Sequence, residues 1–304
     1  MLNLKYALVT PARNEVRLIE QTIQSVLAQT IPPAVWVIVS DGSTDGTDDV
    51  IASYLKDYPW LQLVRMPQRT DRHFAAKVHA FNAGLARANL WDYDIIGNLD
   101  ADITFEPDYF SFLLQQFAED NHLGVAGTPF IEAGVWYDYR FTNIEHVSGA
   151  CQLFRRACFE EIGGYTPLKR GGVDWQAVTT ARMKGWKTRT FTEKFCYHRR
   201  GMGTAEKGKF HALFRQGVKD YYLGGHPLWQ VFRALYQTTR KPYFLGGSFL
   251  LLGYVWSSVT RADRQISPEL IRFHRREQME RLRKALGLRR AKSSEVVAKA
   301  GLSC

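Results

Sequence analysis

Cysteine is scarce in this sequence, and its four thiols form no recognisable pattern. They are Cys151, Cys158, Cys196 and Cys304, and no two are spaced as a CxxC pair. A chain of 304 residues is long enough to bury a core without disulfides. This spacing excludes a small disulfide scaffold and favours reduced thiols in a cytoplasm.

Long uninterrupted apolar runs are also missing. Residues 1–10 (MLNLKYALVT) carry a lysine where a signal peptide needs its apolar stretch, so we expect a first strand there and no export. Residues 243–260 are uncharged but are interrupted by Gly246, Gly247 and Gly253. Because a membrane span needs about 20 predominantly apolar residues, this stretch is marginal as a span.

Acidic residues are outnumbered, 30 against 40 lysines and arginines, which gives a formal net charge of +10. The excess is concentrated in residues 261–292, where eleven basic residues face four acidic ones. Such a charge suits a nucleotide, an anionic membrane or a nucleic acid. No recognised nucleic-acid-binding module is present, and the basic run is separate from the carboxylates discussed below, so no nucleic-acid partner is expected.

The first 130 residues alternate between short apolar runs and segments of helical periodicity. Buried strands are expected at residues 6–10, 35–39, 61–64, 93–99 and 124–128, with helices at 19–27, after 47, at 75–88 and from 107 to 119. Repeated strand–helix units predict an α/β fold with a mostly parallel, Rossmann-like sheet flanked by helices. Ligands of such sheets bind beyond the carboxyl ends of the strands.

The chain is expected to have one main domain and an extension. We predict a domain over residues 1–225, divided into a nucleotide half (1–130) and an acceptor half (131–225). A helical, basic extension (226–290) and a flexible tail (291–304) follow. We expect the extension to associate with a membrane, the alternative being a buried helix hairpin with a charged, solvated outer helix.

Two carboxylates, Asp100 and Asp102, directly follow the apolar run 95–99. Just past a strand end the chain turns, so both side chains can approach one cation. Mg²⁺ or Mn²⁺ typically accepts one or two protein carboxylates and fills its other positions with phosphate oxygens and water. The alternative is a solvated acidic turn.

Four segments occur in a recognisable order: 9–15 (VTPARNE), 39–47 (VSDGSTDGT), Lys77 with 80–84 (AFNAG), and 98–103 (NLDADI). Together they resemble the nucleotide-binding half of the family 2 glycosyltransferases. The resemblance is specific over about residues 5–130 and weaker to about 225. It implies a GT-A fold, which the C-terminal helical extension predicted above would follow, and transfer that inverts the anomeric carbon.

The resemblance also implies roles for individual residues on the donor side. The nucleoside pocket would be lined by Pro11, Ala12, Arg13, Asn14 and Glu15. Asp41 would accept hydrogen bonds from the base, Lys77 would lie toward the diphosphate, and Asp100 toward the ribose or metal. Asp102 would be the direct ligand of Mn²⁺ or Mg²⁺. The alternatives are a surface ion pair between Arg13 and Glu15, a helix cap at Asp41 and a solvated Lys77.

On the acceptor side, Asp174 in 171–175 (GGVDW) matches the aspartate that serves as the family's general base, although Val173 stands where relatives usually carry glutamate. An aspartate within hydrogen-bond reach removes the acceptor's proton as the hydroxyl attacks. The alternative is that Asp174 caps a helix beginning at Trp175. His198 matches a late histidine that approaches the metal in many relatives, the alternative being a structural histidine.

The predicted function is therefore metal-dependent sugar transfer from a nucleotide diphosphate-sugar to a hydroxyl of a glycan or lipid-linked acceptor, in cell-surface polysaccharide or glycolipid synthesis. The signature of processive synthases is not reproduced, which favours addition of single sugars. We expect a cytoplasmic protein, peripheral at the inner face of the membrane. The alternatives are an inactive nucleotide-sugar-binding scaffold and a nucleotidyltransferase, although the latter would need a Gly-rich basic loop after the first strand.

Overall fold

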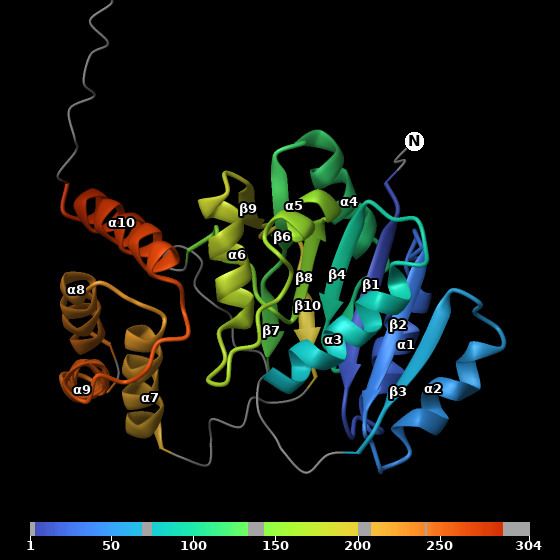
Figure 1. Ribbon diagram of the computed structural model, residues 1–304, viewed down its shortest axis with the longest axis horizontal. Helices are drawn as coiled ribbons and strands as arrows, with labels where there is room; N and C mark the ends of the chain where they lie inside the picture. The colour runs from blue at the N-terminus through green and yellow to red at the C-terminus, as the bar shows by residue number, and fades with distance from the viewer. Residues whose placement is uncertain (1–3, 69–74, 133–142, 200–207, 241, 288–304) are drawn as a thin grey trace, which may run out of the picture. The chain divides into compact units, whose positions relative to one another are not determined.

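The apolar runs near the start of the chain form buried strands, and the segments of helical periodicity between them form helices (Figure 1). The computed structural model describes residues 4–68, 75–132, 143–199, 208–240 and 242–287, so the predicted tail 291–304 lies outside the described residues. The chain divides into two compact units, residues 1–209 and 210–304, and each is described by itself.

The first unit alternates strands and helices from its beginning. Its elements are β1 (Tyr6–Ala12), α1 (Ile19–Leu27), β2 (Val35–Asp41), α2 (Thr47–Leu55), β3 (Leu61–Met66), α3 (Ala75–Ala88), β4 (Ile95–Leu99), β5 (Ile103–Phe105), α4 (Tyr109–Glu119), β6 (Leu123–Gly127), β7 (Phe130–Glu132), β8 (Cys151–Arg155), α5 (Arg156–Glu161), α6 (Val173–Met183), β9 (Lys187–Thr190) and β10 (Cys196–His198).

Among the described residues, seven strands form one sheet in the order β3-β2-β1-β4-β8-β6-β9. Six of them run in the same direction, and β8 is antiparallel to both of its neighbours, β4 and β6. The predicted mostly parallel sheet is therefore confirmed. Strand order reverses between β1 and β4, which creates the kind of crevice where α/β sheets bind ligands.

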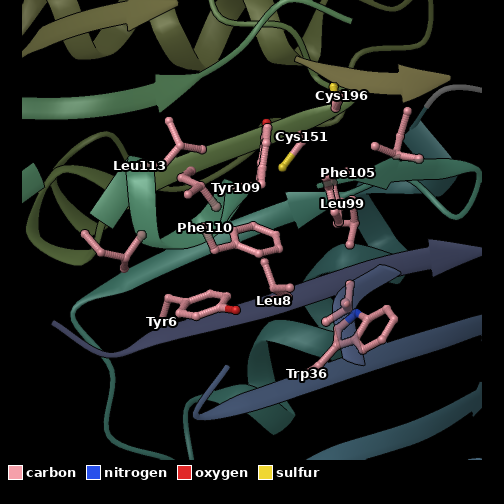
Figure 2. Packing of buried hydrophobic residues seen from close by; sticks show 14 of the residues in the cluster. Tyr6, Leu8, Trp36, Leu99, Phe105, Tyr109, Phe110, Leu113, Cys151 and Cys196 are labelled. Atoms are coloured by element: carbon pink, nitrogen blue, oxygen red, sulfur yellow. The ribbon is translucent and has the colours of Figure 1, made fainter. Parts of the chain in front are cut away.

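Both faces of this sheet are covered, as its apolar strands require. One core joins Tyr6, Leu8 and Trp36 to residues of α1, α2 and α4, and Figure 2 shows the aromatic rings of α4 packed over β1. The other core joins Ala7 and Val9 to residues of α3, α5 and α6. Adjacent β1 residues thus point to opposite cores, as the two-residue repeat of a strand dictates.

A second, three-stranded sheet in the order β5-β10-β7 lies beyond the end of β4. Strand β10 pairs antiparallel with β5, so that His198 faces Ile103, and parallel with β7. The backbone amide of Arg199 continues this pairing by donating to the carbonyl of Asp102 (2.9 Å). The small sheet therefore brings the late part of the unit to the segment that follows β4.

The second unit consists of four helices, among the residues that the structure describes: α7 (Lys209–Tyr222), α8 (Pro227–Thr238), α9 (Leu245–Val259) and α10 (Pro268–Ala285). Glycines allow α9 to pack closely on its neighbours. A Cβ on Gly253 would lie 2.0 Å from the carbonyl oxygen of Phe214 in α7, and one on Gly247 would lie 2.2 Å from that of Ala234 in α8. No described helix combines the length and the apolar character needed to cross a bilayer.

For three elements, the expected starting residue is wrong by two. Strand β4 begins at Ile95 rather than Tyr93, because its pairing with β1 begins at Ile95 and the Asp94 side chain accepts a hydrogen bond from the Lys5 amide instead. Helix α4 begins at Tyr109 rather than Pro107. Helix α6 begins at Val173, with Gly172 (φ 90°) as its N-cap, so the alternative in which Asp174 caps a helix starting at Trp175 is wrong.

Candidate functional site

The turn after β4 places Asp100 and Asp102 at the carboxyl end of the central strand. The turn is fixed on two sides: the Asp100 amide donates to the carbonyl of Ala150 (2.9 Å), and the Thr22 hydroxyl donates to the carbonyl of Ala101 (2.9 Å). Asp100 keeps 27% of its side chain exposed, and Asp102 is buried. The backbone that carries both carboxylates is therefore held in place beside the crevice.

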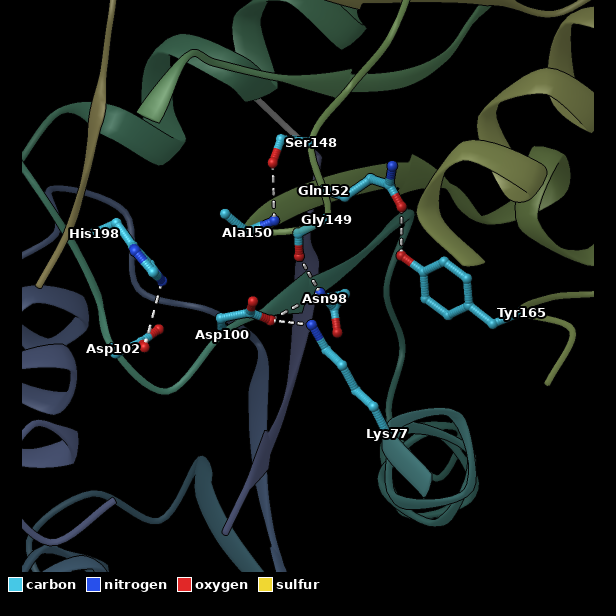
Figure 3. A network of polar contacts seen from close by, with 10 residues as sticks. All are labelled: Lys77, Asn98, Asp100, Asp102, Ser148, Gly149, Ala150, Gln152, Tyr165 and His198. Carbon is cyan, nitrogen blue, oxygen red and sulfur yellow. Dashed lines mark hydrogen bonds and ion pairs between the residues drawn. The ribbon is translucent and has the colours of Figure 1, made fainter. Parts of the chain in front are cut away.

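Lys77, in the first turn of α3, forms an ion pair with Asp100 (Figure 3). Burial acts to lower the pKa of Lys77, but Asp100, with smaller contributions from the charges of Asp174 and Asp102, leaves it raised. The pKa of Asp100 is raised as well, because its burial and the nearby charge of Asp102 outweigh Lys77. One cation thus lies within electrostatic reach of all three carboxylates, so Lys77 is not simply a solvated helix residue.

Asp174 lies in the first turn of α6 and reaches the same region through Gly149. A Cβ on Gly149 would lie 3.0 Å from the Cβ of Asp174 and 3.5 Å from its Oδ2. The carbonyl of Gly149 accepts a hydrogen bond of 2.6 Å from Nδ2 of Asn98, whose other contact, at 3.5 Å, is Oδ1 of Asp100 (Figure 3). The structure therefore brings Asp174 to the same side of the unit as Asp100.

His198, the last residue of β10, lies opposite Asp102: its Nε2 is 3.4 Å from Oδ2 of the carboxylate (Figure 3). This interaction raises the pKa of His198. The other ring nitrogen, Nδ1, is buried and has no hydrogen-bond partner among the described residues. The predicted pair of candidate metal ligands is therefore brought together from β10 and the turn after β4.

The loops after β1 and β2 are joined to each other. Asn14 (φ 56°) donates its amide to the Ser43 hydroxyl (3.1 Å), and its side-chain oxygen accepts from the Thr44 amide (2.9 Å). The Glu15 amide donates to the Thr47 hydroxyl (2.8 Å). The pair of loops forms a polar shelf between the ends of β1 and β2. Of the predicted nucleoside segment, Arg13, Asn14 and Glu15 lie in this shelf, whereas Pro11 and Ala12 are the last residues of β1.

Asp41 is the buried last residue of β2 and lies in the strand itself. Helix α2 begins at Thr47 with Gly46 as its capping residue. The alternative in which Asp41 is simply a helix cap is therefore wrong, and Asp41 lies beside the polar shelf at the end of β2.

The donor atoms at Asp102 and His198 suit a hard divalent cation, since carboxylate oxygen and imidazole nitrogen both bind Mn²⁺ and Mg²⁺ takes carboxylate. Among the described residues, no group of three or more His, Cys, Asp or Glu side chains is arranged to enclose a metal ion. Two protein ligands leave most of the coordination sphere to water or a ligand's phosphates, which is how these ions commonly bind at phosphate sites.

Three further residues in this region escaped the sequence analysis as site candidates: Asn98, Gly149 and Gln152. Asn98 stood inside the 98–103 motif without a role, and Gly149 lies far away in sequence. Gln152 is fully buried, accepts a hydrogen bond from the Tyr165 hydroxyl (2.6 Å) and donates to the Val147 carbonyl (2.8 Å). A buried amide on an apolar strand is a detectable signal, but its partners become visible only in the fold.

Solved structures of other proteins share the fold of this chain. The mannosyltransferase PcManGT from Pyrobaculum calidifontis, solved with GDP-Man and Mn²⁺, matches 94% of this chain and 81% of its own with a TM-score of 0.57 and 20% identity. Residues 1–349 of S. aureus TarS match 93% and 79% with a TM-score of 0.55 and 14% identity. These likenesses confirm the predicted GT-A fold class.

Curated relatives match part of this sequence. Poly-beta-1,6-N-acetyl-D-glucosamine synthase of Staphylococcus epidermidis is 24% identical over 211 residues, which cover 62% of this chain and 47% of the relative. Its counterpart from Staphylococcus aureus strain COL is 30% identical over 170 residues, 49% of this chain and 39% of the relative. The chain thus spans less than half the length of these relatives.

The family profile matches a longer segment than residues 5–130, over which the resemblance in the sequence analysis is specific. The sequence profile described as glycosyl transferase family 2 matches residues 7–167, which is more than half of the chain. The match begins in β1, includes the 98–103 motif and ends two residues after Tyr165, the partner of Gln152. The chain therefore belongs to glycosyl transferase family 2.

Proposed function

We propose that this protein is an inverting glycosyltransferase that moves a sugar from a nucleotide diphosphate-sugar onto an acceptor hydroxyl. One observation carries the proposal: Lys77, Asp100 and Asp174 converge from α3, the end of β4 and α6 on one side of the sheet, with Asp102 beside them. A cation, a metal-binding carboxylate and a separate carboxylate are the groups that displacement of a diphosphate by an alcohol requires.

On the donor side, the polar shelf and the strand ends beside it, which together carry residues 11–15 and Asp41, would hold the nucleoside. Lys77 would move from Asp100 toward the diphosphate as that anion arrives, and Asp100 would be released toward the ribose or the metal. Asp102 and His198 would hold Mn²⁺ or Mg²⁺, which stabilises the charge that develops on the departing diphosphate.

On the acceptor side, Asp174 would accept the proton of the attacking hydroxyl. Its place in the first turn of α6 puts the carboxylate at the positive end of a helix. Asp174 reaches the region from α6 and not from the turn that carries Asp100 and Asp102. A base separate from the metal carboxylates is what a single displacement with inversion needs, and no covalent enzyme intermediate is required.

The curated relatives are named as polysaccharide synthases, and this supports a role in the synthesis of a cell-surface polysaccharide or glycolipid. Because the processive signature is not reproduced at residues 237–241 (QTTRK), we propose addition of single sugars to a glycan or lipid-linked acceptor. The donors in the structural relatives' titles carry different bases, GDP-Man for one and UDP-GlcNAc for another, so both nucleotide classes belong in the first screen.

The test is release of nucleoside diphosphate from UDP- and GDP-sugars with Mn²⁺ or Mg²⁺. We expect turnover that depends on the metal and is lost in Asp102→Ala. Asp174→Asn should keep nucleotide binding and lose transfer, whereas Asp108→Ala, at an exposed carboxylate on the N-cap of α4, serves as the control. Nucleotide binding without turnover would identify an inactive scaffold, and pyrophosphate release from a nucleoside triphosphate would identify a nucleotidyltransferase.

The second unit supports a location at the cytoplasmic surface of an anionic membrane. Sixteen large apolar side chains are exposed among the residues that the structure describes, and thirteen of them lie in residues 210–286. Those of α8 and α9 form two stripes at helical spacing on helices that pack together. The stripes are Leu228, Val231 and Leu235 on α8, and Leu252, Val255, Trp256 and Val259 on α9.

Charge agrees with this location. Residues 221–262, which contain both stripes, include no aspartate or glutamate, but include Arg233, Arg240, Lys241 and Arg261. A partly buried apolar helix face flanked by basic residues and Trp is the pattern of helices that lie in the membrane interface, where each basic residue contributes about 1 kcal/mol. Attachment of this kind needs no membrane-spanning helix.

Vesicle flotation tests the attachment. We expect the chain to float with phosphatidylcholine vesicles that contain phosphatidylglycerol, and less with phosphatidylcholine alone. The double variant Trp256→Ser/Val259→Ser should stay behind, whereas Trp91→Ser, at an exposed tryptophan of the first unit, should float like the unaltered protein. The membrane proposal is wrong if the unaltered protein floats with neither kind of vesicle and sediments as a dimer, whereas the double variant sediments as a monomer. The stripes would then join two copies of the chain.

A further inference from the structure

The peptide at Gly149 touches both halves of the site. Its carbonyl accepts the 2.6 Å hydrogen bond from Asn98, at the end of β4, and its Cα faces the side chain of Asp174, at the start of α6. Asn98 also lies 3.5 Å from Oδ1 of Asp100. A short chain of contacts, from Asp100 through Asn98 and Gly149 to Asp174, thus connects a donor-side carboxylate with the acceptor-side carboxylate (Figure 3).

The segment that carries Gly149 is held at both ends. On one side, the Ala150 carbonyl accepts from the Asp100 amide (2.9 Å), which extends the antiparallel pairing of β4 with β8. On the other side, the Val147 carbonyl accepts from Gln152 (2.8 Å), whose oxygen is in turn fixed by the Tyr165 hydroxyl (2.6 Å). A shift of the segment would break these hydrogen bonds and leave buried polar groups unpaired, which costs free energy. The segment therefore has little freedom to move.

Glycine is the only residue type that fits at position 149 without a shift of Asp174. A Cβ at 3.0 Å from the Cβ and 3.4 Å from the Cγ of Asp174 is closer than ordinary van der Waals contact, so either α6 or the Asp174 rotamer would have to give way. Any side chain at residue 149 therefore displaces the carboxylate that faces it.

We propose that Asn98 and Gly149 are positioning residues, which set the distance between the donor site and the base Asp174. This inference rests on the proposed function. Asn98 fixes the Gly149 peptide to the end of β4, and the bare Cα of Gly149 gives Asp174 its seat. In an in-line displacement the base, the acceptor oxygen and the anomeric carbon must be aligned, and misplacement of a reacting group by 1 Å can cost about a hundredfold in rate.

The experiment separates turnover from donor binding in two variants. In Gly149→Ala, every hydrogen bond of the segment is kept and only the seat of Asp174 changes; in Asn98→Ala, the seat is kept and its tie to β4 is lost. For both we expect kcat to fall about tenfold or more, as displacement by a fraction of an ångström predicts. The Kd of the nucleoside diphosphate with Mn²⁺, measured by calorimetry, should change less than about twofold because neither variant removes a donor ligand.

Asn121→Ala, which removes an exposed amide side chain from the turn before β6, is the control and should change neither quantity. If Asn98→Ala lowers the thermal stability too far for kinetics, Gly149→Ala decides. Unchanged kcat in Gly149→Ala overturns the inference, as does a loss of nucleotide affinity in proportion to kcat, because the residues would then belong to the donor site.

Failure of the inference and failure of the proposed function give different results. An unaltered protein that releases no nucleoside diphosphate from any sugar donor, or an Asp174→Asn variant with full transfer activity, contradicts the proposed function. An active unaltered protein that needs Asp174 but tolerates both positioning variants contradicts only the inference.

Discussion

Replacing Lys77 with methionine keeps the length of the side chain and removes its charge. Two unit charges 4 Å apart interact by about 4 kcal/mol at the effective dielectric of a protein surface. Because the Lys77 side chain is 45% exposed, screening by solvent reduces the useful part to about 1–2 kcal/mol. We therefore expect Lys77→Met to weaken binding of a nucleoside diphosphate about 5- to 30-fold, since each 1.4 kcal/mol is a factor of ten.

Isothermal titration of the nucleoside diphosphate in the presence of Mn²⁺ measures this loss. Lys56→Met removes the same charge from an exposed position after α2 and should bind as the unaltered protein does. The difference between the two variants should shrink as salt is added, because exposed charges are screened. Equal affinities of Lys77→Met and Lys56→Met at low salt would refute the assignment of Lys77 to the diphosphate.

Three other predictions concern reactivity, pH and packing. Burial raises the pKa of the Cys158 and Cys196 thiols to about 12, and that of Cys151 well above its usual range; all three should resist iodoacetamide in the folded protein and react after unfolding, and rapid labelling of any of them in the native state, read by mass spectrometry, contradicts this. The side chain of His226 caps α8 by accepting from the Leu228 amide, and burial, with the charge of Arg275, lowers its pKa from 6.5. As the pH falls below 6.5, the unfolded chain binds more protons than the folded chain, so the helical unit should lose stability. His226→Asn keeps a hydrogen-bond acceptor at the cap and should make the thermal midpoint less dependent on pH. Parallel curves of midpoint against pH for the two proteins would show that His226 does not cause the effect. Gly253→Ala should destabilise by about 2–3 kcal/mol in urea unfolding because the new methyl meets a backbone carbonyl; exposed Ser258→Ala is the control, and equal midpoints would mean that α9 is free to move.

Most of the fold of the first 130 residues could be predicted because its signals are local; the three-residue strand β5 was not predicted. The helix expected at residues 75–88 forms with those bounds, since apolar spacing alone decides it. The antiparallel strand β8 was not predicted, because its place between β4 and β6 depends on pairing across more than 25 residues of intervening chain. Sequence periodicity carries no information about which strands become neighbours.

The candidate site divides in the same way. Asp100 and Asp102 could be found from their place after an apolar run, because a strand end and a carboxylate pair are both local features. Asn98 and Gly149 could not be paired, since their contact joins residues 51 apart. The experiments above test the expected roles of Lys77, Asp102 and Asp174.

The pairing of β5 with β10 has a consequence for synthesis of the protein on the ribosome. Asp102 is made early, but the strand that carries its partner His198 follows almost a hundred residues later. While the chain is still growing, the parallel strands β1 to β4 can assemble before the imidazole exists. A nascent chain that ends before residue 198 would therefore carry Asp102 without the imidazole of His198 beside it. The cation affinity that we propose for this pair would be acquired only near the end of translation of the first unit.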